Sequence, residues 1–198
     1  MLLSGIEIQK RMRASTWRRI KCALFGKRGA EPRPDILIRP FDEKYCQPNS
    51  YDVHLADTLR FYKPGIELPP KDEDATIAVV IPDEGLILQP GEFCLGSTLE
   101  HTETHNLVPR LVGCAGVASW GLSIVAAAGF GDIGYKGVWT MHIKNLSKNP
   151  VRLTKGMKIG QLFYSSVSGK HRLYAGKYLG TTGATASRLY QDVKNETM

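Results

Sequence analysis

Cysteine is scarce in this sequence, and its spacing excludes two kinds of architecture. The chain has 198 residues and four cysteines, with no Cys-x-x-Cys pair among Cys22, Cys46, Cys94 and Cys114. A disulfide scaffold and the Pro-Cys-x-x-Cys pattern of zinc deaminases are therefore both excluded. Scattered single cysteines are typical of a reducing compartment, so we expect a cytoplasmic protein without zinc and without a metal site built from side chains.

The sequence also lacks an apolar signal peptide and a clear membrane span. Arg11 and Arg13 interrupt the early apolar residues. Residues 111–131 carry no charge, but they include five glycines and are followed at once by Asp132. Two buried strands with a glycine-rich connection explain this stretch better than a membrane span. We expect no membrane contact.

Net charge is absent from most of the chain. Residues 1–34 contain nine Lys or Arg and two Asp or Glu, whereas residues 35–198 contain seventeen of each. The net charge of +7 therefore belongs to the N-terminal segment. Its basic residues between positions 10 and 28 form either a solvated face and linker, or a contact for phosphates, nucleic acid or an acidic partner.

Short β-type segments separated by Pro and Gly turns fill the rest of the chain. An exception is the N-terminus, where residues 1–25 have a helical pattern with Ser4 as the N-cap and Ile6 and Met12 in a loose apolar stripe. The pattern predicts an all-β fold with a short N-terminal helix, either a sandwich or a jelly-roll-like barrel. The expected strands are residues 36–41, 51–55, 58–62, 77–81, 86–88, 93–98, 138–143 and two within 151–164.

Five short sequence motifs, called words below, occur in the same order as in the dCTP deaminases and resemble theirs. The dCTP deaminases are a family of the dCTP deaminase/trimeric dUTPase superfamily. The family words are Q-P-x-S-Y-D-L/V-x-L, L-x-P-G-E-F-x-L-x, A-G-F-x-D-P-G-F/Y-x-G followed by a strand ending W-T-L-E, G-M-x-I-G-Q-L and K-Y-x-G-Q-x-x-P-T-x-S-R. They correspond here to residues 47–55, 88–96, 128–137 with 139–142, 156–162 and 177–188. The resemblance implies a distorted jelly-roll-like β-barrel that assembles as a homotrimer, with active sites between subunits. We expect a basic helix and inserted loop over residues 1–35, the barrel over 36–175 and a flexible tail over 176–198.

The resemblance assigns the sugar end of a deoxynucleotide site to one glycine-rich turn. In the family, the aspartate of this turn accepts a hydrogen bond from the 3′-hydroxyl, and in dUTPases an acid here also orients the attacking water. Asp132 inherits these roles, and Tyr135 would stack on the sugar and exclude a 2′-hydroxyl. The alternatives are an Asp132 that only forms the turn and a Tyr135 that is a half-buried barrel aromatic. Within the same words, Gly131, Thr140 and Gln161 are further candidates for substrate contact.

The family's catalytic glutamate position is occupied by His142. Metal-free deamination of cytosine needs a group that takes a proton from water and delivers it to N3 and to the leaving amine. Histidine can shuttle protons near neutral pH, but it lacks the negative charge that stabilises a protonated pyrimidine. His142 is therefore either an altered catalytic group or a residue that fills the space of the glutamate.

The phosphate end of the site has changed as well. The family motif G-R/K-S-S/T-x-x-R-x-G-L aligns with residues 113–122, and Cys114, Ala115 and Ser119 replace its first arginine, its serine and its second arginine. Cys and Ser cannot supply the permanent, planar charge of arginine to a phosphate. Lys177, Arg188 or the N-terminal basic segment are candidates to compensate for the lost charge.

The C-terminal word implies a tail that closes over the triphosphate and excludes water. Its candidate substrate contacts are Lys177, Tyr178, Ser187 and Arg188, while Thr181 and Ala184 replace the family's Gln and Pro. An active enzyme of this family would use Mg²⁺ together with the nucleoside triphosphate.

Three functions remain open from the sequence. The first is a hydrolase of this family, which deaminates dCTP or cleaves dUTP with the help of Asp132. The second is an inactive homologue that binds a nucleotide, a nucleotide signal or a protein partner. The third is an enzyme for a modified pyrimidine, in which the small side chains of Cys114 and Ala115 enlarge the pocket. The replaced residues favour deoxynucleotide binding over ordinary dCTP deamination.

Overall fold

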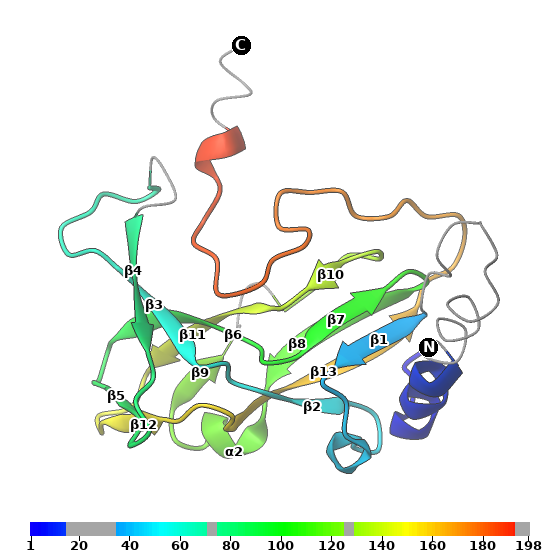
Figure 1. Cartoon of the computed structure of the whole chain (residues 1–198), viewed down its shortest axis with the longest axis horizontal. Helices are drawn as coiled ribbons and strands as arrows, with labels where there is room; N and C mark the ends of the chain where they lie inside the picture. Colours follow the sequence, from blue (N-terminus) through cyan, green and yellow to red (C-terminus); the bar gives the residue numbers. More distant parts are fainter. Residues whose placement is uncertain (15–34, 71–74, 125–128, 193–198) are drawn as a thin grey trace.

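Short antiparallel strands make up most of the fold, which we analysed in a computed structural model of the chain (Figure 1). The structure describes residues 1–14, 35–70, 75–124 and 129–192. The expected inserted loop and most of the basic segment 10–28 lie outside these residues. The strands confirm the all-β class with an N-terminal helix.

The largest sheet has five strands in the order β4-β3-β6-β11-β9. These are β4 (Thr76–Val80), β3 (Thr58–Tyr62), β6 (Phe93–Ser97), β11 (Thr140–Asn145) and β9 (Leu122–Ile124). Side chains of β11 alternate in burial, so that Met141 and Ile143 face the core while Thr140 and His142 lie on the opposite, half-buried face. The sheet thus presents His142 away from the core.

Three smaller sheets complete the barrel. The first joins β2 (Tyr51–His54), β13 (Lys158–Ser166) and β8 (Leu107–Gly113), and the second joins β1 (Ile36–Arg39), β7 (His101–Thr104) and β10 (Lys136–Gly137). The third pairs β12 (Val151–Leu153) with β5 (Leu86–Leu88). A short 3-10 helix, η1 (Glu43–Tyr45), precedes β2, and the short helix α2 (Ala115–Ala118) follows β8. The fully buried large side chains between these sheets include Tyr51, Leu59, Leu88, Leu111 and Tyr164.

The N-terminal helix includes residues 5–14 and packs on the barrel. Ser4 Oγ accepts a hydrogen bond from Glu7 N at 3.2 Å, as expected of an N-cap. Met12 is buried as expected, but Ile6 is 80% exposed and Ile8 is fully buried. The predicted stripe was wrong at Ile6 because the helix buries the face that carries Ile8 and Met12.

Two expected elements differ in detail. The uncharged stretch 111–131 holds the end of β8 and the whole of β9, the two strands expected there, and the connection between them, which contains Gly116 and Gly121, includes the short helix α2. The strand expected at 138–143 is observed at Thr140–Asn145. Val138 N and Trp139 N donate to Thr181 O and Thr98 Oγ1, at 2.9 and 3.0 Å, so these two donors are used outside the ladder. Within the described residues, no helix is long and apolar enough to cross a membrane.

Candidate functional site

The turn that carries Asp132 is held by strand β8 and by close packing. Gly131 N donates to Pro109 O at 2.9 Å, and Leu111 N donates to Gly129 O at 2.7 Å. A Cβ atom on Gly131 would lie 2.3 Å from Trp139 Cη2, so this position has room only for glycine. The turn closes with Tyr135 N donating to Asp132 O at 3.1 Å. Asp132 itself is exposed, and the turn therefore presents its carboxylate to ligands.

Tyr135 links the turn to the C-terminal segment. Its hydroxyl donates to Val138 O at 2.6 Å and lies 2.9 Å from Thr181 Oγ1. Its ring lies against Trp139 and Tyr174, with ring centroids 5.2 and 6.1 Å apart. Burial raises the pKa of Tyr135, so its hydroxyl stays protonated near neutral pH. The residue is half-buried, and its ring forms a fixed wall.

His142 lies on β11, directly opposite Leu95 of β6. Its ring stacks on Phe93, with centroids 6.3 Å apart and an angle of 18° between the planes. Burial lowers the pKa of His142 from its ordinary value of 6.5, so the imidazole is neutral at pH 7. Its Nδ1 atom is buried and has no hydrogen-bond partner within the described residues. Since buried polar atoms are usually paired, Nδ1 is suited to a hydrogen bond from a ligand or water.

The C-terminal segment forms a roof over the turn and β11. Gly180 N donates to Lys136 O at 2.8 Å, Thr185 N donates to Thr140 Oγ1 at 3.1 Å, and Tyr174 N donates to Ile133 O at 2.7 Å. Farther along, Arg188 N donates to Tyr178 Oη at 2.9 Å. The tail is therefore docked on the barrel of its own chain (Figure 1).

Turn, strand and roof enclose a cavity of about 470 Å³. It is large enough for a small ligand such as a nucleotide. Asp132 is the one carboxylate among its described lining residues. Seven of the predicted site residues come together here: Gly131, Asp132, Tyr135, Thr140, His142, Tyr178 and Ser187.

Six lining residues were not predicted as site residues: Phe130, Trp139, Tyr174, Thr181, Thr185 and Leu189. Phe130 and Trp139 lie inside the family words, so the match to those words could have predicted them as site residues. Tyr174 lies outside the words, and only its docking against Ile133 and Tyr135 brings it to the site.

The remaining predicted site residues lie elsewhere in this chain. Cys114 is buried at the start of α2, and Ala115 and Ser119 are exposed beside it. Ser119 Oγ donates to Ala115 O at 2.9 Å. Figure 1 places α2 at the opposite side of the molecule from the C-terminal tail. One chain therefore does not bring these three residues to its own cavity.

Lys177 and Arg188 belong to the tail but do not line this cavity. Lys177 pairs with Asp192, and Arg188 donates to Lys177 O and lines a neighbouring cavity.

Gln161 belongs to a polar cluster on β2 and β13. Its side-chain amide and that of Gln47 donate to the buried carboxylate of Asp52, at 3.2 and 2.9 Å, and Lys158 Nζ lies 3.2 Å from the same carboxylate. Gln161 is thus occupied within its own barrel.

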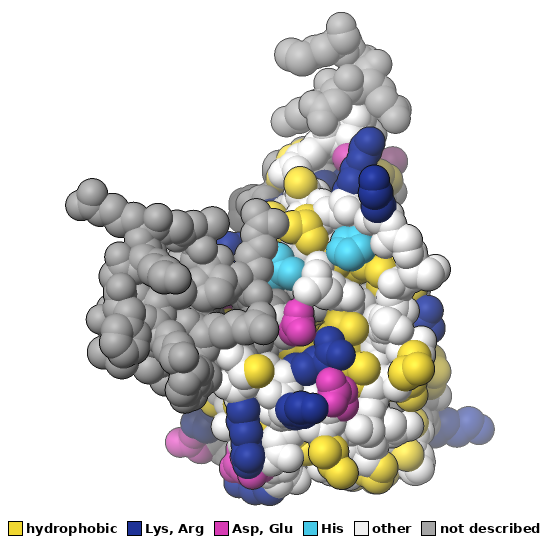
Figure 2. Space-filling model, turned by 90° about the vertical axis from the view of Figure 1, so that its right-hand side faces the viewer, with side chains coloured by type: hydrophobic (Ala, Val, Ile, Leu, Met, Phe, Trp, Pro, Cys, Tyr) yellow, Lys and Arg dark blue, Asp and Glu magenta, His cyan; other side chains and the backbone are white. Residues whose placement is uncertain are grey.

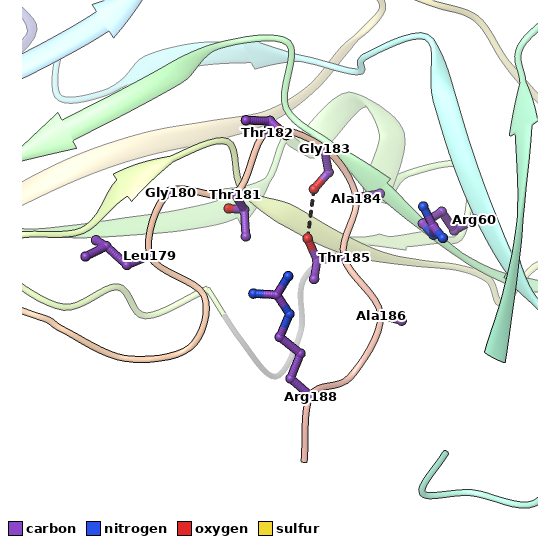
Figure 3. Close-up of a pocket in the computed structure, with 10 residues that line it drawn as sticks. All are labelled: Arg60, Leu179, Gly180, Thr181, Thr182, Gly183, Ala184, Thr185, Ala186 and Arg188. Carbon is purple, nitrogen blue, oxygen red and sulfur yellow. Dashed lines mark hydrogen bonds between the residues drawn. The ribbon is translucent and has the colours of Figure 1, made fainter. Parts of the chain in front are cut away.

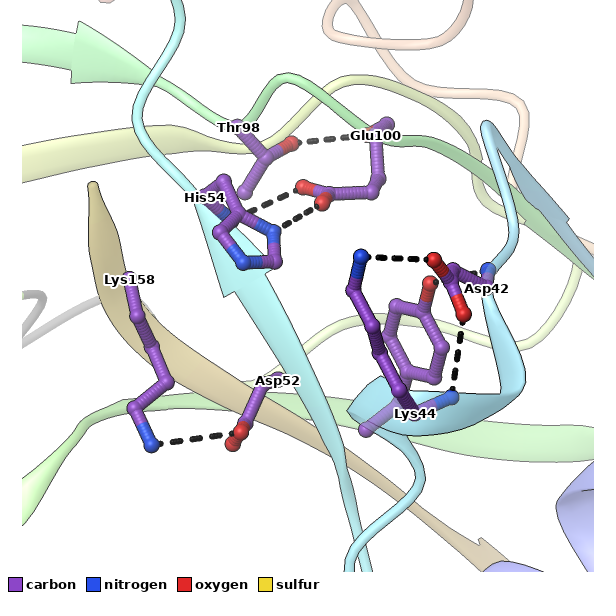
Figure 4. Close-up of polar contacts among 8 residues, drawn as sticks. Asp42, Lys44, Asp52, His54, Thr98, Glu100 and Lys158 are labelled. Atoms are coloured by element: carbon purple, nitrogen blue, oxygen red, sulfur yellow. Dashed lines mark hydrogen bonds and ion pairs between the residues drawn. The ribbon is translucent and has the colours of Figure 1, made fainter. Parts of the chain in front are cut away.

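A buried His–Glu pair lies near this cluster (Figure 4). Glu100 accepts a hydrogen bond from His54 N at 3.0 Å, and His54 Nδ1 lies 2.6 Å from Glu100 Oε1. Their side chains are 8% and 2% exposed. The ring of Tyr45 covers His54, with centroids 4.2 Å apart. The pair joins β2 to the residue before β7, and neither member is among the described lining residues of the cavity, so we assign it a structural role.

Groups of His, Cys, Asp and Glu able to hold a metal ion are not found in the described part of the chain. A lone carboxylate such as Asp132 suits Mg²⁺ only when the phosphates of a nucleotide supply further oxygen ligands. The absence of zinc and of a side-chain metal site stays a prediction.

Charged side chains are mixed on the face shown in Figure 2. There, Lys and Arg side chains alternate with Asp and Glu, and no single basic patch covers the described atoms. The basic residues 15–28 lie outside the described part, so nucleic-acid contact through residues 10–28 stays a prediction.

The strands form a β-barrel whose tail lies over a cavity beside an acidic turn, and this fold can be compared with solved structures. The structure is similar to that of a 2′-deoxycytidine 5′-triphosphate deaminase from Agrobacterium tumefaciens, with a TM-score of 0.55 and 15% identity. The match covers 82% of this chain and 47% of that chain, so this protein spans about half the length of that neighbour. At this identity the likeness shows the fold alone.

Sequence comparison then places the chain within a family. The model for dCTP deaminase-like domains matches residues 27–167, and the chain belongs to the dCTP deaminase-like family. A "dCTP deaminase, dUMP-forming" of Leptospira biflexa is 38% identical over 197 residues, covering 99% of this chain and 100% of the relative. Relatives of the same description from Hathewaya histolytica and Clostridium acetobutylicum are 37% and 41% identical, over 97% and 81% of this chain and 99% and 92% of their own lengths.

Proposed function

We propose that the protein binds a pyrimidine deoxynucleotide in the cavity between the Asp132 turn, β11 and the tail. The observation that carries the proposal is the enclosure of about 470 Å³ with Asp132, Tyr135 and His142 on its walls. The exposed carboxylate of Asp132 suits a hydrogen bond from a sugar 3′-hydroxyl. Tyr135 is held by Val138 and Thr181, so it is a rigid obstacle to a 2′-hydroxyl.

We further propose that the protein does not deaminate dCTP by the route of its family. Deamination needs a group that removes a proton from water and transfers it to N3 and to the departing amine. His142 occupies that place as a neutral imidazole, and no second carboxylate lines the described cavity. Neutral histidine provides no negative charge beside a protonated cytosine, so the transition state loses electrostatic stabilisation.

Calorimetry with a nucleotide panel tests both statements. We expect saturable binding of deoxynucleotides such as dCTP, dUTP and dTTP, and weak or absent binding of the matching ribonucleotides. Chromatography of dCTP incubated with the protein is expected to show no dUTP or dUMP above the blank. Binding without turnover would support an inactive homologue, and turnover of dCTP would refute the catalytic part of the proposal.

The variant His142→Glu is the matched test of the missing carboxylate. We expect it to gain measurable dCTP deamination if the rest of the cavity still orients a cytosine. A His142→Gln variant, which has similar size but no charge, is expected to remain inactive.

The names of the relatives favour a second candidate, hydrolysis that yields dUMP. Asp132 could orient a water molecule for attack on the α-phosphate of dUTP, which releases dUMP and pyrophosphate. Mg²⁺ would be held mainly by the phosphates, since Asp132 is the one carboxylate in the described lining. The test is pyrophosphate release from dUTP with Mg²⁺, with and without EDTA, in the wild type and in Asp132→Asn.

The third candidate, an enzyme for a modified pyrimidine, is tested by adding 5-substituted pyrimidine deoxynucleotides to the same assay.

We also propose that the protein assembles as a homotrimer. The residues aligned with the family's phosphate motif lie on α2, away from the cavity of their own chain (Figure 1). In a trimer, α2 of a neighbouring subunit would face the cavity and contribute Ser119 and Ala115 to it.

A further inference from the structure

Strand β4 (Thr76–Val80) lies at one end of the five-stranded sheet, so one of its two edges has no neighbouring strand among the described residues. Figure 1 shows β4 at the outer margin of the sheet, beside β3. The antiparallel register between β3 and β4 runs without a shift over all five residues of β4. The strand is therefore a regular edge without a bulge.

The backbone groups of β4 alternate in direction. Lys63 N donates to Ala75 O and Ile81 N donates to Asp57 O, so in this register the odd-numbered residues of β4 bond to β3. The N–H and C=O groups of the even-numbered residues therefore point away from β3, toward the open edge. They have no backbone partner in the described part of the chain, and they belong to Thr76, Ala78 and Val80.

The open edge of β4 lacks the usual protection against strand pairing. Natural edge strands are commonly short, or they carry a charge, a proline or a bulge. β4 reads Thr-Ile-Ala-Val-Val, and its Ile77 and Val80 are 49% and 66% exposed. Of the other described edge strands, β1, β2, β8, β10 and β12 each contain a charged residue, and β5 and β9 have three residues each. β4 is thus the long, uncharged edge of the described barrel.

The neighbouring strand β3 is already engaged on both faces within the chain. Leu59 is fully buried in the core. On the other face, Arg60 Nε donates to Thr76 Oγ1 at 2.9 Å, and Arg60 lines a cavity together with the tail (Figure 3). These contacts hold β3 and β4 in place, so a partner meets a preformed edge of β4 and loses little freedom in ordering it.

We propose that β4 pairs with β4 of a second copy of this chain, antiparallel and about a two-fold axis at Ala78. In this register Ala78 faces its own counterpart and Thr76 faces Val80, so every outward N–H and C=O group finds a partner. Ile77 faces Val79, and all pairs across the axis are uncharged. An uncharged edge carries no charge to select a different protein, whereas its own symmetric register satisfies all of its outward groups. Because each copy has one such edge, the contact closes as a two-fold pair.

This contact is separate from the proposed nucleotide cavity and from the proposed trimer. A pair of five-residue strands covers less surface than the roughly 1,000 Å² of a stable interface. The pairing is therefore weak and depends on protein concentration.

Light scattering over a concentration series tests the pairing in the full-length protein. We expect the mass of the wild type to at least double between about 5 µM and about 500 µM, the range in which small interfaces form. Ala78→Pro removes the outward N–H at the axis and no bond to β3. It should keep its fold, and its mass should stay at the low-concentration value throughout the series.

A second variant does not depend on a change in the backbone. Ala78 is exposed, so Ala78→Lys is accommodated in one copy but places two like charges directly opposite each other at the axis. We expect Ala78→Lys to abolish the rise in mass, and the neutral control Ala78→Ser to associate like the wild type. Thermal melts confirm that each variant is folded before the masses are compared.

A cysteine cross-link tests the register. Opposed residues of a hydrogen-bonded antiparallel pair have Cα atoms about 5.5 Å apart, which suits a disulfide. With copper phenanthroline and air as the oxidant, Ala78→Cys should give a covalent dimer on a non-reducing gel. Val80→Cys, which faces Thr76 in this register, and the wild type with its native cysteines are the controls and should give much less dimer.

The outcomes separate this inference from the proposed trimer and nucleotide binding. A mass that doubles in the wild type and stays constant in Ala78→Pro and Ala78→Lys supports the pairing of β4. A constant wild-type mass, or an equal rise in both variants, refutes it and leaves this edge to a strand of another protein. The trimer is read from the mass at low concentration, so either proposal can fail while the other stands.

Discussion

The imidazole of His142 stacks on Phe93 and is held neutral by burial. A carboxylate at the same place would face the opposite effect, because burial raises the pKa of an acid and keeps a proton available for transfer. If His142 stands at the place of the family's glutamate, burial at this position lowers the pKa of the histidine, whereas it would raise the pKa of the glutamate.

The titration of His142 gives a pH-dependent stability with a defined sign. Its pKa in the folded state lies below the ordinary value of 6.5, so the unfolded chain takes up a proton first as the pH falls. The contribution of His142 to stability is complete above about pH 6.5 and is lost as the pH falls toward its folded pKa. We expect an NMR titration to give His142 a pKa below 6.5, and His142→Gln to show a flatter loss of stability with acid. A pKa of His142 above 6.5 would contradict this.

A second residue-level prediction concerns Glu100. Its carboxylate accepts from His54 N and contacts His54 Nδ1, and its side chain is 2% exposed. Removal of one partner from a buried, hydrogen-bonded pair costs about 3 kcal/mol. We expect Glu100→Ala to lower the unfolding free energy in urea by about this amount, whereas Glu67→Ala, at an exposed position, should be near neutral.

Among the elements, the turn at residues 129–137 has the tightest steric requirement. A Cβ atom on Gly131 would meet Trp139 Cη2 at 2.3 Å and Pro109 Cγ at 2.9 Å. We expect Gly131→Ala to destabilise the protein by about 1–3 kcal/mol and to weaken nucleotide binding, since the overpacked turn must move Asp132. Gly116→Ala is the control, because nothing lies within 4 Å of its added methyl group. Equal stability and affinity of the two variants would argue against this packing.

The elements also show how far the sequence predicts the structure. Strands β3 and β5 were predicted at their observed bounds, because alternation and flanking turns are local signals. The bounds of β11 were missed because Val138 and Trp139 donate to Thr181 and Thr98, contacts with residues distant in sequence. Asp132, Tyr135 and His142 were found since they lie in one continuous word, whereas Tyr174 and Arg60 reach the cavities only through tertiary packing.

The whole molecule places the candidate cavity and the residues aligned with the family's phosphate motif on opposite sides of one chain. The cavity and tail lie on one side and α2 on the other, as Figure 1 shows. If the proposed trimer forms, light scattering after size exclusion should give a mass close to three times 21.9 kDa. A mass of 21.9 kDa at micromolar concentration would contradict the trimer and would leave α2 with no cavity to complete.

The bond between Tyr135 and Thr181 has a consequence for kinetics. In the proposed binding mode, the phenol of Tyr135 excludes a ribose, and the same phenol secures the tail at 2.9 Å from the threonine hydroxyl. A sugar that pushes Tyr135 aside must loosen the tail as well, so discrimination against ribonucleotides should appear as a shortened residence time, with association rates barely changed.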